Sequence, residues 1–99
     1  MNPRNKEYIK DLFKIIEAVP FGDVEILVKR VDRKTAQLST VSQETLRYVN
    51  NKEAIDDLFS MVTKLIEASF SGETHIKLEM KDGQIKIIGI FDKKDTKYS

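Results

Sequence analysis

The strongest constraint on the fold is a local pattern that this 99-residue chain repeats at a spacing of fifty residues. Residues Lys14–Ala18 (KIIEA) align with Lys64–Ala68 (KLIEA), and Gly22 then aligns with Gly72. In both places a helical pattern ends, a glycine follows and a strand pattern begins. The repeat indicates two copies of one helix–hairpin unit, each too small to bury its apolar face alone.

The two units divide the chain near its middle, into about residues 1–49 and 50–99. Ninety-nine residues is the length of one domain, so we expect a single domain over residues 1–99 with one shared core. If the duplication is structural, residues 8–41 superimpose on residues 58–91 with the same element order and the same strand pairing.

Apolar side chains at helical spacing predict two helices. The first opens at Asn2-Pro3 and ends at Pro20, because proline cannot continue the backbone hydrogen-bond ladder. The second begins at Asn50, whose spacing from Glu53 is that of a capping box, and ends at Ser71-Gly72. Its apolar stripe predicts the centre of the core, with Leu65 largely buried beside Leu58, Phe59, Val62 and Ile66.

The first pair of strands is predicted to form a hairpin with a basic tip. Strands from Val24 and over Ala36–Val41 lie on either side of a polar turn at Asp32–Thr35. A basic hairpin is one way to enter a nucleic-acid groove, although this tip has no aromatic residue for base stacking. A solvated hairpin tip is also commonly charged. The candidate nucleic-acid contacts are Lys29, Arg30, Arg33 and Lys34.

The second pair of strands, over about residues 74–81 and 84–92, has the strongest hairpin signal in the chain. Asp82-Gly83 favours a type I′ turn between them. The element order is therefore α-β-β-α-β-β. The predicted fold class is α+β, in which the two hairpins form one four-stranded antiparallel sheet with both helices on one face.

The predicted strand over about residues 84–92 has apolar residues on both of its faces. The two-residue turn places Leu78 opposite Ile87 on one face, which leaves Ile88 and Ile90 on the other. A sheet with helices on one side usually presents a polar far face, so these residues suggest a contact surface, although scattered surface hydrophobes are common. The candidate partner interface is Leu27, Val31, Ile88 and Ile90.

The first unit resembles a known family at one place. The segment Phe21–Val28 (FGDVEILV), with Glu44–Arg47 (ETLR) further on, is similar to the YezD-like family of small bacterial proteins. Members of that family show a helix, a Tyr/Phe-Gly-Ser-Val stretch, a hairpin and a terminal Glu-Lys-x-Arg. The resemblance covers roughly residues 12–48, and this chain differs by a longer hairpin and a whole second unit. It implies a helix–hairpin unit and no particular chemistry, because the family has no established activity.

No combination of residues predicts a catalytic, metal or cofactor site. His75 is the only histidine and is expected on the predicted strand over about residues 74–81, on the same face as Glu79. Because the chain has no cysteine, a lone histidine does not make a metal site. Asp56 and Asp57 follow Glu53 at the start of the second helix, where carboxylates complement the positive end of the helix dipole. We therefore predict a non-enzymatic protein without a cofactor.

Composition and charge narrow the class of function. A net charge of +1 is low for a protein that binds nucleic acid mainly through its phosphates. No apolar run approaches the roughly 20 residues that cross a bilayer, and no signal peptide is visible, so we expect a cytoplasmic protein without a membrane partner. We predict an interaction or regulatory module that forms a homodimer. The alternative is a nucleic-acid-binding accessory protein that uses the first hairpin.

Overall fold

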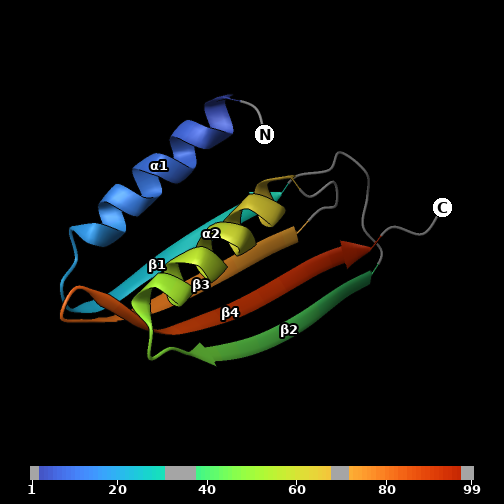
Figure 1. Ribbon diagram of the computed structural model, residues 1–99. Helices are drawn as coiled ribbons and strands as arrows, with labels where there is room; N and C mark the ends of the chain where they lie inside the picture. Colours follow the sequence, from blue (N-terminus) through green and yellow to red (C-terminus); the bar gives the residue numbers. More distant parts are fainter. Residues whose placement is uncertain (1–2, 31–37, 68–71, 97–99) are drawn as a thin grey trace.

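The computed structural model describes residues 3–30, 38–67 and 72–96. In chain order its elements are α1 (Pro3–Glu17), β1 (Gly22–Arg30), β2 (Leu38–Arg47), α2 (Asn51–Glu67), β3 (Gly72–Lys81) and β4 (Gln84–Thr96). Figure 1 shows the two helices on one side of a four-stranded antiparallel sheet. The predicted α+β class and the order α-β-β-α-β-β are confirmed.

The strands lie in the order β1-β3-β4-β2, so the prediction that β1 and β2 form a hairpin is wrong. β1 pairs with β3, β2 pairs with β4, and the first two strands occupy opposite edges of the sheet. The apolar content of the strands explains this order. β3 and β4 supply Ile76, Leu78, Ile85 and Ile88, all almost fully buried, whereas residues 41–45 of β2 are exposed.

The different strand pairing means that the two halves of the chain are not two equivalent helix–hairpin units. Both halves have the order helix, strand, strand, but only β3 and β4 pair with each other within one half. The predicted superposition of residues 8–41 on residues 58–91 requires the same pairing in both, and is therefore wrong. The sequence repeat describes local structure and does not extend to the sheet.

The turn between β3 and β4 forms as its sequence predicts. Asp82 and Gly83 both have positive φ, 53° and 72°, as the two central residues of a type I′ turn require. The Gly83 amide also donates a hydrogen bond of 2.9 Å to the Pro20 carbonyl oxygen. This bond ties the segment after α1 to the central hairpin.

One β-bulge in β4 determines which side chains face the helices. Met80 lies opposite Ile85, but its neighbour Glu79 lies opposite Ile87, so Lys86 is an extra residue on β4. The Lys86 carbonyl oxygen accepts a hydrogen bond of 2.8 Å from the Tyr48 amide, which satisfies part of the bulged backbone. Since side chains alternate across a strand, one extra residue exchanges the two faces of β4 beyond this point.

The core lies between the helices and the near face of the sheet. α1 contributes Ile9 and Ile16, and α2 contributes Ala54, Leu58 and Val62. The sheet contributes Ile76, Leu78, Met80, Ile85 and Ile88. The predicted burial of Leu58 and Val62 is confirmed, while Leu65 and Ile66 are partly buried at the edge of the same cluster.

The predicted burial of Phe59 is wrong, because 48% of this residue is exposed. Consecutive residues of a helix point about 100° apart, so the burial of Leu58 turns Phe59 away from the sheet. Phe59 instead lies near Phe13 of α1, with the two ring centroids 6.1 Å apart. It therefore fills the space between the helices and not the centre of the core.

Side chains at the start of α2 fix this helix against the sheet. The Asn50 side chain accepts hydrogen bonds from the amides of Lys52 and Glu53, which confirms the predicted helix cap. The Asn51 side chain accepts a 2.8 Å hydrogen bond from the Ile85 amide of β4. These bonds hold the first turn of α2 over the beginning of β4.

Tyr48 makes a second connection between the sheet and α2. Its hydroxyl donates a hydrogen bond of 2.8 Å to the Asp57 carboxylate. Burial raises the pKa of the Tyr48 phenol well above its ordinary value, and the hydrogen bond to Asp57 adds to this shift. The neutral phenol is therefore the form that the folded protein stabilises.

Candidate functional site

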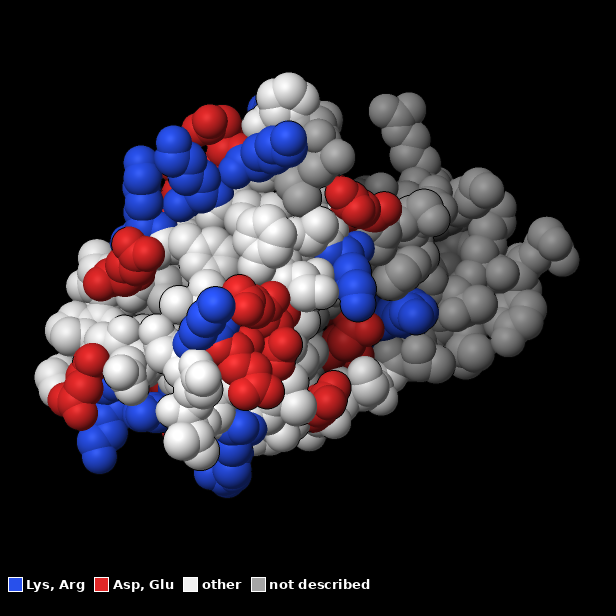
Figure 2. Space-filling model, viewed as in Figure 1, with Lys and Arg blue, Asp and Glu red and all other residues white. Residues whose placement is uncertain are grey.

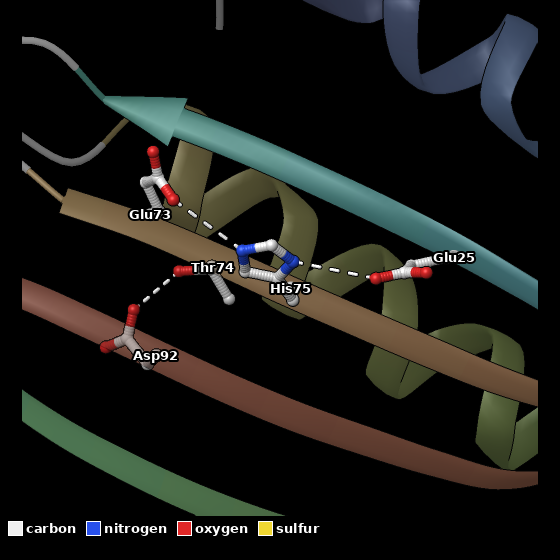
Figure 3. Close-up of polar contacts among 5 residues, drawn as sticks. All are labelled: Glu25, Glu73, Thr74, His75 and Asp92. Carbon is white, nitrogen blue, oxygen red and sulfur yellow. Dashed lines mark hydrogen bonds and ion pairs between the residues drawn. The ribbon is translucent and has the colours of Figure 1, made fainter.

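The face of the sheet opposite the helices is the candidate site, and we call it the outer face. Figure 3 looks onto this face, with α2 behind the strands. Among the described residues, no helix or further strand covers it. Residues directly opposite one another on paired strands point to the same face of the sheet. The strand pairing therefore divides the side chains of the outer face into rows that run across all four strands.

One of the two middle rows of the outer face, which we call the central row, carries one aliphatic side chain, two aromatic rings and a glutamine. Leu27 of β1 lies opposite His75 of β3, His75 opposite Phe91 of β4, and Phe91 opposite Gln43 of β2. Leu27 is 47% exposed, and the Phe91 ring meets the His75 ring nearly edge-on with centroids 5.9 Å apart. Ile87 lies on the same face, two rows away. An aromatic pair and two aliphatic side chains thus lie on an uncovered surface.

The imidazole of His75 lies between two carboxylates (Figure 3). Its Nδ1 lies 3.6 Å from Glu25 of β1, and its Nε2 lies 3.6 Å from Glu73 of β3. The imidazole becomes a cation when it is protonated, and both contacts are then ion pairs. Because both ring nitrogens face carboxylates, the ring is oriented within the face and is not directed toward a nucleophile.

A shallow, open hollow lies beside His75, where Gly89 has no side chain. Its volume is about 430 Å³, and its walls include Gln43, Thr45, Lys77 and Phe91. A Cβ added at Gly89 would lie 3.8 Å from its nearest neighbour, so the backbone leaves room for a side chain there. The hollow can therefore receive a side chain from another molecule.

Charged residues of both signs surround the central row. The row nearest the β3–β4 turn contains Asp23, Glu79, Ile87 and Arg47. The row at the other end contains Lys29, Glu73, Lys93 and Val41. The Lys77 ammonium lies 3.3 Å from the Asp23 carboxylate, and both side chains remain more than half exposed. Charged side chains of both signs therefore border the central row.

The residues of the predicted partner interface do not share one face of the sheet. Leu27 lies on the outer face, but Ile88 is fully buried on the helix side, where Ile90 is also partly buried. The bulge at Lys86 is the reason, because it moves both isoleucines to the opposite face. Val31 lies outside the described residues.

Sequence reasoning missed Ile87 and Phe91 as residues of the outer face. A signal for them exists in the spacing of Ile85, Ile88 and Ile90, three and then two residues apart. Residues on one face of a regular strand are two positions apart, so a spacing of three indicates one extra residue, as in a β-bulge. The outer face of β4 then consists of the alternating positions between them.

β1 and β2 are not paired and so do not form the predicted basic hairpin, whose tip lies outside the described residues. Lys29 lies on the outer face opposite Glu73, Arg30 ends β1, and Arg33 and Lys34 lie outside the described residues. On the helix side, Figure 2 shows lysines and arginines interspersed with acidic residues and no field of one sign across the described part. The described residues therefore do not form a continuous basic surface in this view.

The described residues contain no cluster of three or more histidine, aspartate or glutamate side chains with the geometry of a metal site. Glu53 lies in the first turn of α2, whereas Asp57 lies in the second turn and accepts the hydrogen bond of Tyr48. In the same described part of the chain, no helix combines the length and apolarity that a membrane crossing requires.

Comparison with protein-family models, with curated proteins and with solved structures gives no match to this chain.

Proposed function

We propose that this protein is a non-enzymatic interaction module that acts as a homodimer, and that the two copies meet through the outer face of the sheet. The observation that carries the proposal is the central row of Leu27, His75 and Phe91 on a face that no helix of the described residues covers. Full burial of an aliphatic or aromatic side chain is worth about 1.5–3 kcal/mol. Covering this row with a second chain therefore provides a driving force for association.

A second copy of the chain is the partner that this face fits best. A twofold-symmetric contact uses one surface twice, so the surface must complement itself in shape and charge. The outer face is an open sheet, which packs well against another sheet, and its border carries both acidic and basic side chains. A strongly acidic or basic partner would meet like charges on it.

Sedimentation equilibrium tests the proposal with the unmodified protein and two matched variants. We expect the wild type to approach twice its chain mass of 11.4 kDa at high concentration. Leu27→Glu places a charge in the central row and should give a monomer. Ile15→Glu changes an aliphatic residue that is similarly exposed, at 59%, but lies on α1, and should leave the dimer intact.

The wild type must associate for the proposal to hold. A monomer at every accessible concentration would overturn it, as would equal loss of the dimer in both variants. Circular dichroism spectra of the variants should match that of the wild type, because both substituted side chains are exposed in the single chain.

A further inference from the structure

We infer that the twofold axis of this homodimer runs parallel to the strands, between β3 and β4, so that β1 of one copy lies over β2 of the other. The inference rests on the proposed function and adds the orientation of the partner and the residues that the partner contributes. It follows from the order of charges along the four rows of the outer face.

A twofold axis in the plane between two packed sheets has two simple orientations relative to the strands. An axis parallel to the strands keeps each row opposite itself and reverses the order of the strands. An axis perpendicular to the strands keeps each strand opposite itself and reverses the order of the rows. Aligned packing of twisted sheets, at about 30° between strand directions, accommodates either arrangement.

The parallel axis pairs opposite charges at both ends of the face. In the row nearest the β3–β4 turn, Asp23 lies at the β1 edge and Arg47 at the β2 edge, so each Asp23 meets the partner's Arg47. In the row at the other end, Glu73 of β3 meets the partner's Lys93 of β4. All four side chains are partly or fully exposed in the single chain, and symmetry makes each pair twice.

The same axis also places complementary groups at the centre of the contact. Each His75 meets the partner's Phe91, so two histidine and two phenylalanine rings gather around the axis. In the next row, each Lys77 lies over the partner's Gly89. The hollow at Gly89 then receives the aliphatic stem of the lysine, whose ammonium can extend toward the border.

The perpendicular axis gives a poorer match. It places Asp23 opposite the partner's Lys29, which is favourable, but it also places Glu79 of β3 opposite the partner's Glu73, in the end rows of the face. That contact brings like charges together twice in each dimer, and juxtaposed like charges are strongly unfavourable. Charge complementarity therefore selects the parallel axis.

Charge exchange between Asp23 and Arg47 tests the orientation. Asp23→Arg and Arg47→Asp, each alone, bring like charges together and should raise the dimer dissociation constant at least about tenfold. The double variant restores opposite charges and should return the constant to within about threefold of the wild type. Asp11→Arg, a matched charge reversal on the exposed surface of α1, should leave the constant unchanged.

A second test uses the absence of cysteine from the chain, which makes introduced cysteines unique. A mixture of Asp23→Cys and Arg47→Cys proteins should cross-link through a short bismaleimide more efficiently than either variant alone. With the perpendicular axis, efficient cross-linking would instead occur between Asp23→Cys and Lys29→Cys proteins.

The outcomes separate this inference from the proposed function. Recovery of the dimer in the double variant, together with the Asp23–Arg47 cross-link, supports the inferred orientation. A dimer that Leu27→Glu abolishes, but that charge exchange does not restore, overturns the orientation and leaves the proposed function standing. A wild-type monomer at all concentrations overturns both.

Discussion

The β-bulge at Lys86 leads to a direct prediction about two neighbouring isoleucines. In the bulged register Ile88 is fully buried beneath α2, whereas Ile87 lies on the outer face and is only partly buried. Without the bulge the two residues exchange places, because side chains alternate across a strand. Ile88→Ala should therefore destabilise the protein far more than Ile87→Ala.

The expected difference follows from the atoms that each substitution removes from the core. Isoleucine to alanine deletes three carbon groups, worth about 0.8 kcal/mol each when buried, or about 2.4 kcal/mol in total. A residual cavity of about 50 Å³ would add about 1 kcal/mol, at about 24 cal/mol per Å³. Ile88→Ala should thus cost about 3–4 kcal/mol. Ile87→Ala should cost about 1 kcal/mol, because solvent already reaches part of that side chain.

Urea denaturation of both variants measures these costs, in the Leu27→Glu background so that association does not contribute to stability. If Ile88→Ala does not fold, Ile88→Val and Ile87→Val give the same comparison at about 0.5–1.5 kcal/mol for the buried site. A cost of Ile87→Ala equal to or greater than that of Ile88→Ala would refute the bulged register, and with it the assignment of the outer face.

Three further predictions test the helices and the charge of the molecule. In urea denaturation, Leu58→Ala should cost about 2–5 kcal/mol, and Phe59→Ala should cost about half of what a buried phenylalanine would. A larger cost for Phe59→Ala than for Leu58→Ala would contradict the orientation of α2. Tyr48→Phe should cost about 1–2 kcal/mol near neutral pH through loss of the hydrogen bond to Asp57. The pKa of Tyr48 is raised in the folded protein, so the stability that this residue contributes is complete below its unfolded pKa of about 10 and falls as pH rises further. The difference in stability between wild type and Tyr48→Phe should therefore shrink above about pH 10. Duplex DNA should show little or no binding near physiological salt by fluorescence anisotropy; tight binding with a log–log salt slope near about −3.6, from four cations, would instead favour a nucleic-acid role.

Local structure was the part of this fold that the sequence predicts best. Helical spacing locates both helices, Asn50 marks the start of α2, and Asp82-Gly83 forms the expected turn. Each of these signals acts between residues close together in the chain, so nearby sequence is enough to identify them. The exposed position of Leu27 follows in the same way from the regular alternation of β1.

Strand order was less predictable because it depends on competition between whole strands. β1 and β2 are neighbours in the sequence, yet each gains more by pairing with the apolar central hairpin than with the other. The outer face was predicted incorrectly at Ile88 and Ile90 for a different reason. The extra residue Lys86 inverts every later side chain of β4, and its only trace in the sequence is the three-residue spacing between Ile85 and Ile88, which strict alternation does not take into account.

The solvent exposure of His75 gives the most direct test of the outer face as the dimer contact. His75 is the only histidine in the chain, so its imidazole proton signals report on the centre of this face without ambiguity. In the single chain 37% of its side chain is exposed. At high protein concentration, these signals should be protected from a soluble paramagnetic agent, and dilution or Leu27→Glu should remove the protection. Equal broadening of the His75 signals at all concentrations, while sedimentation reports a dimer, would contradict association through this face.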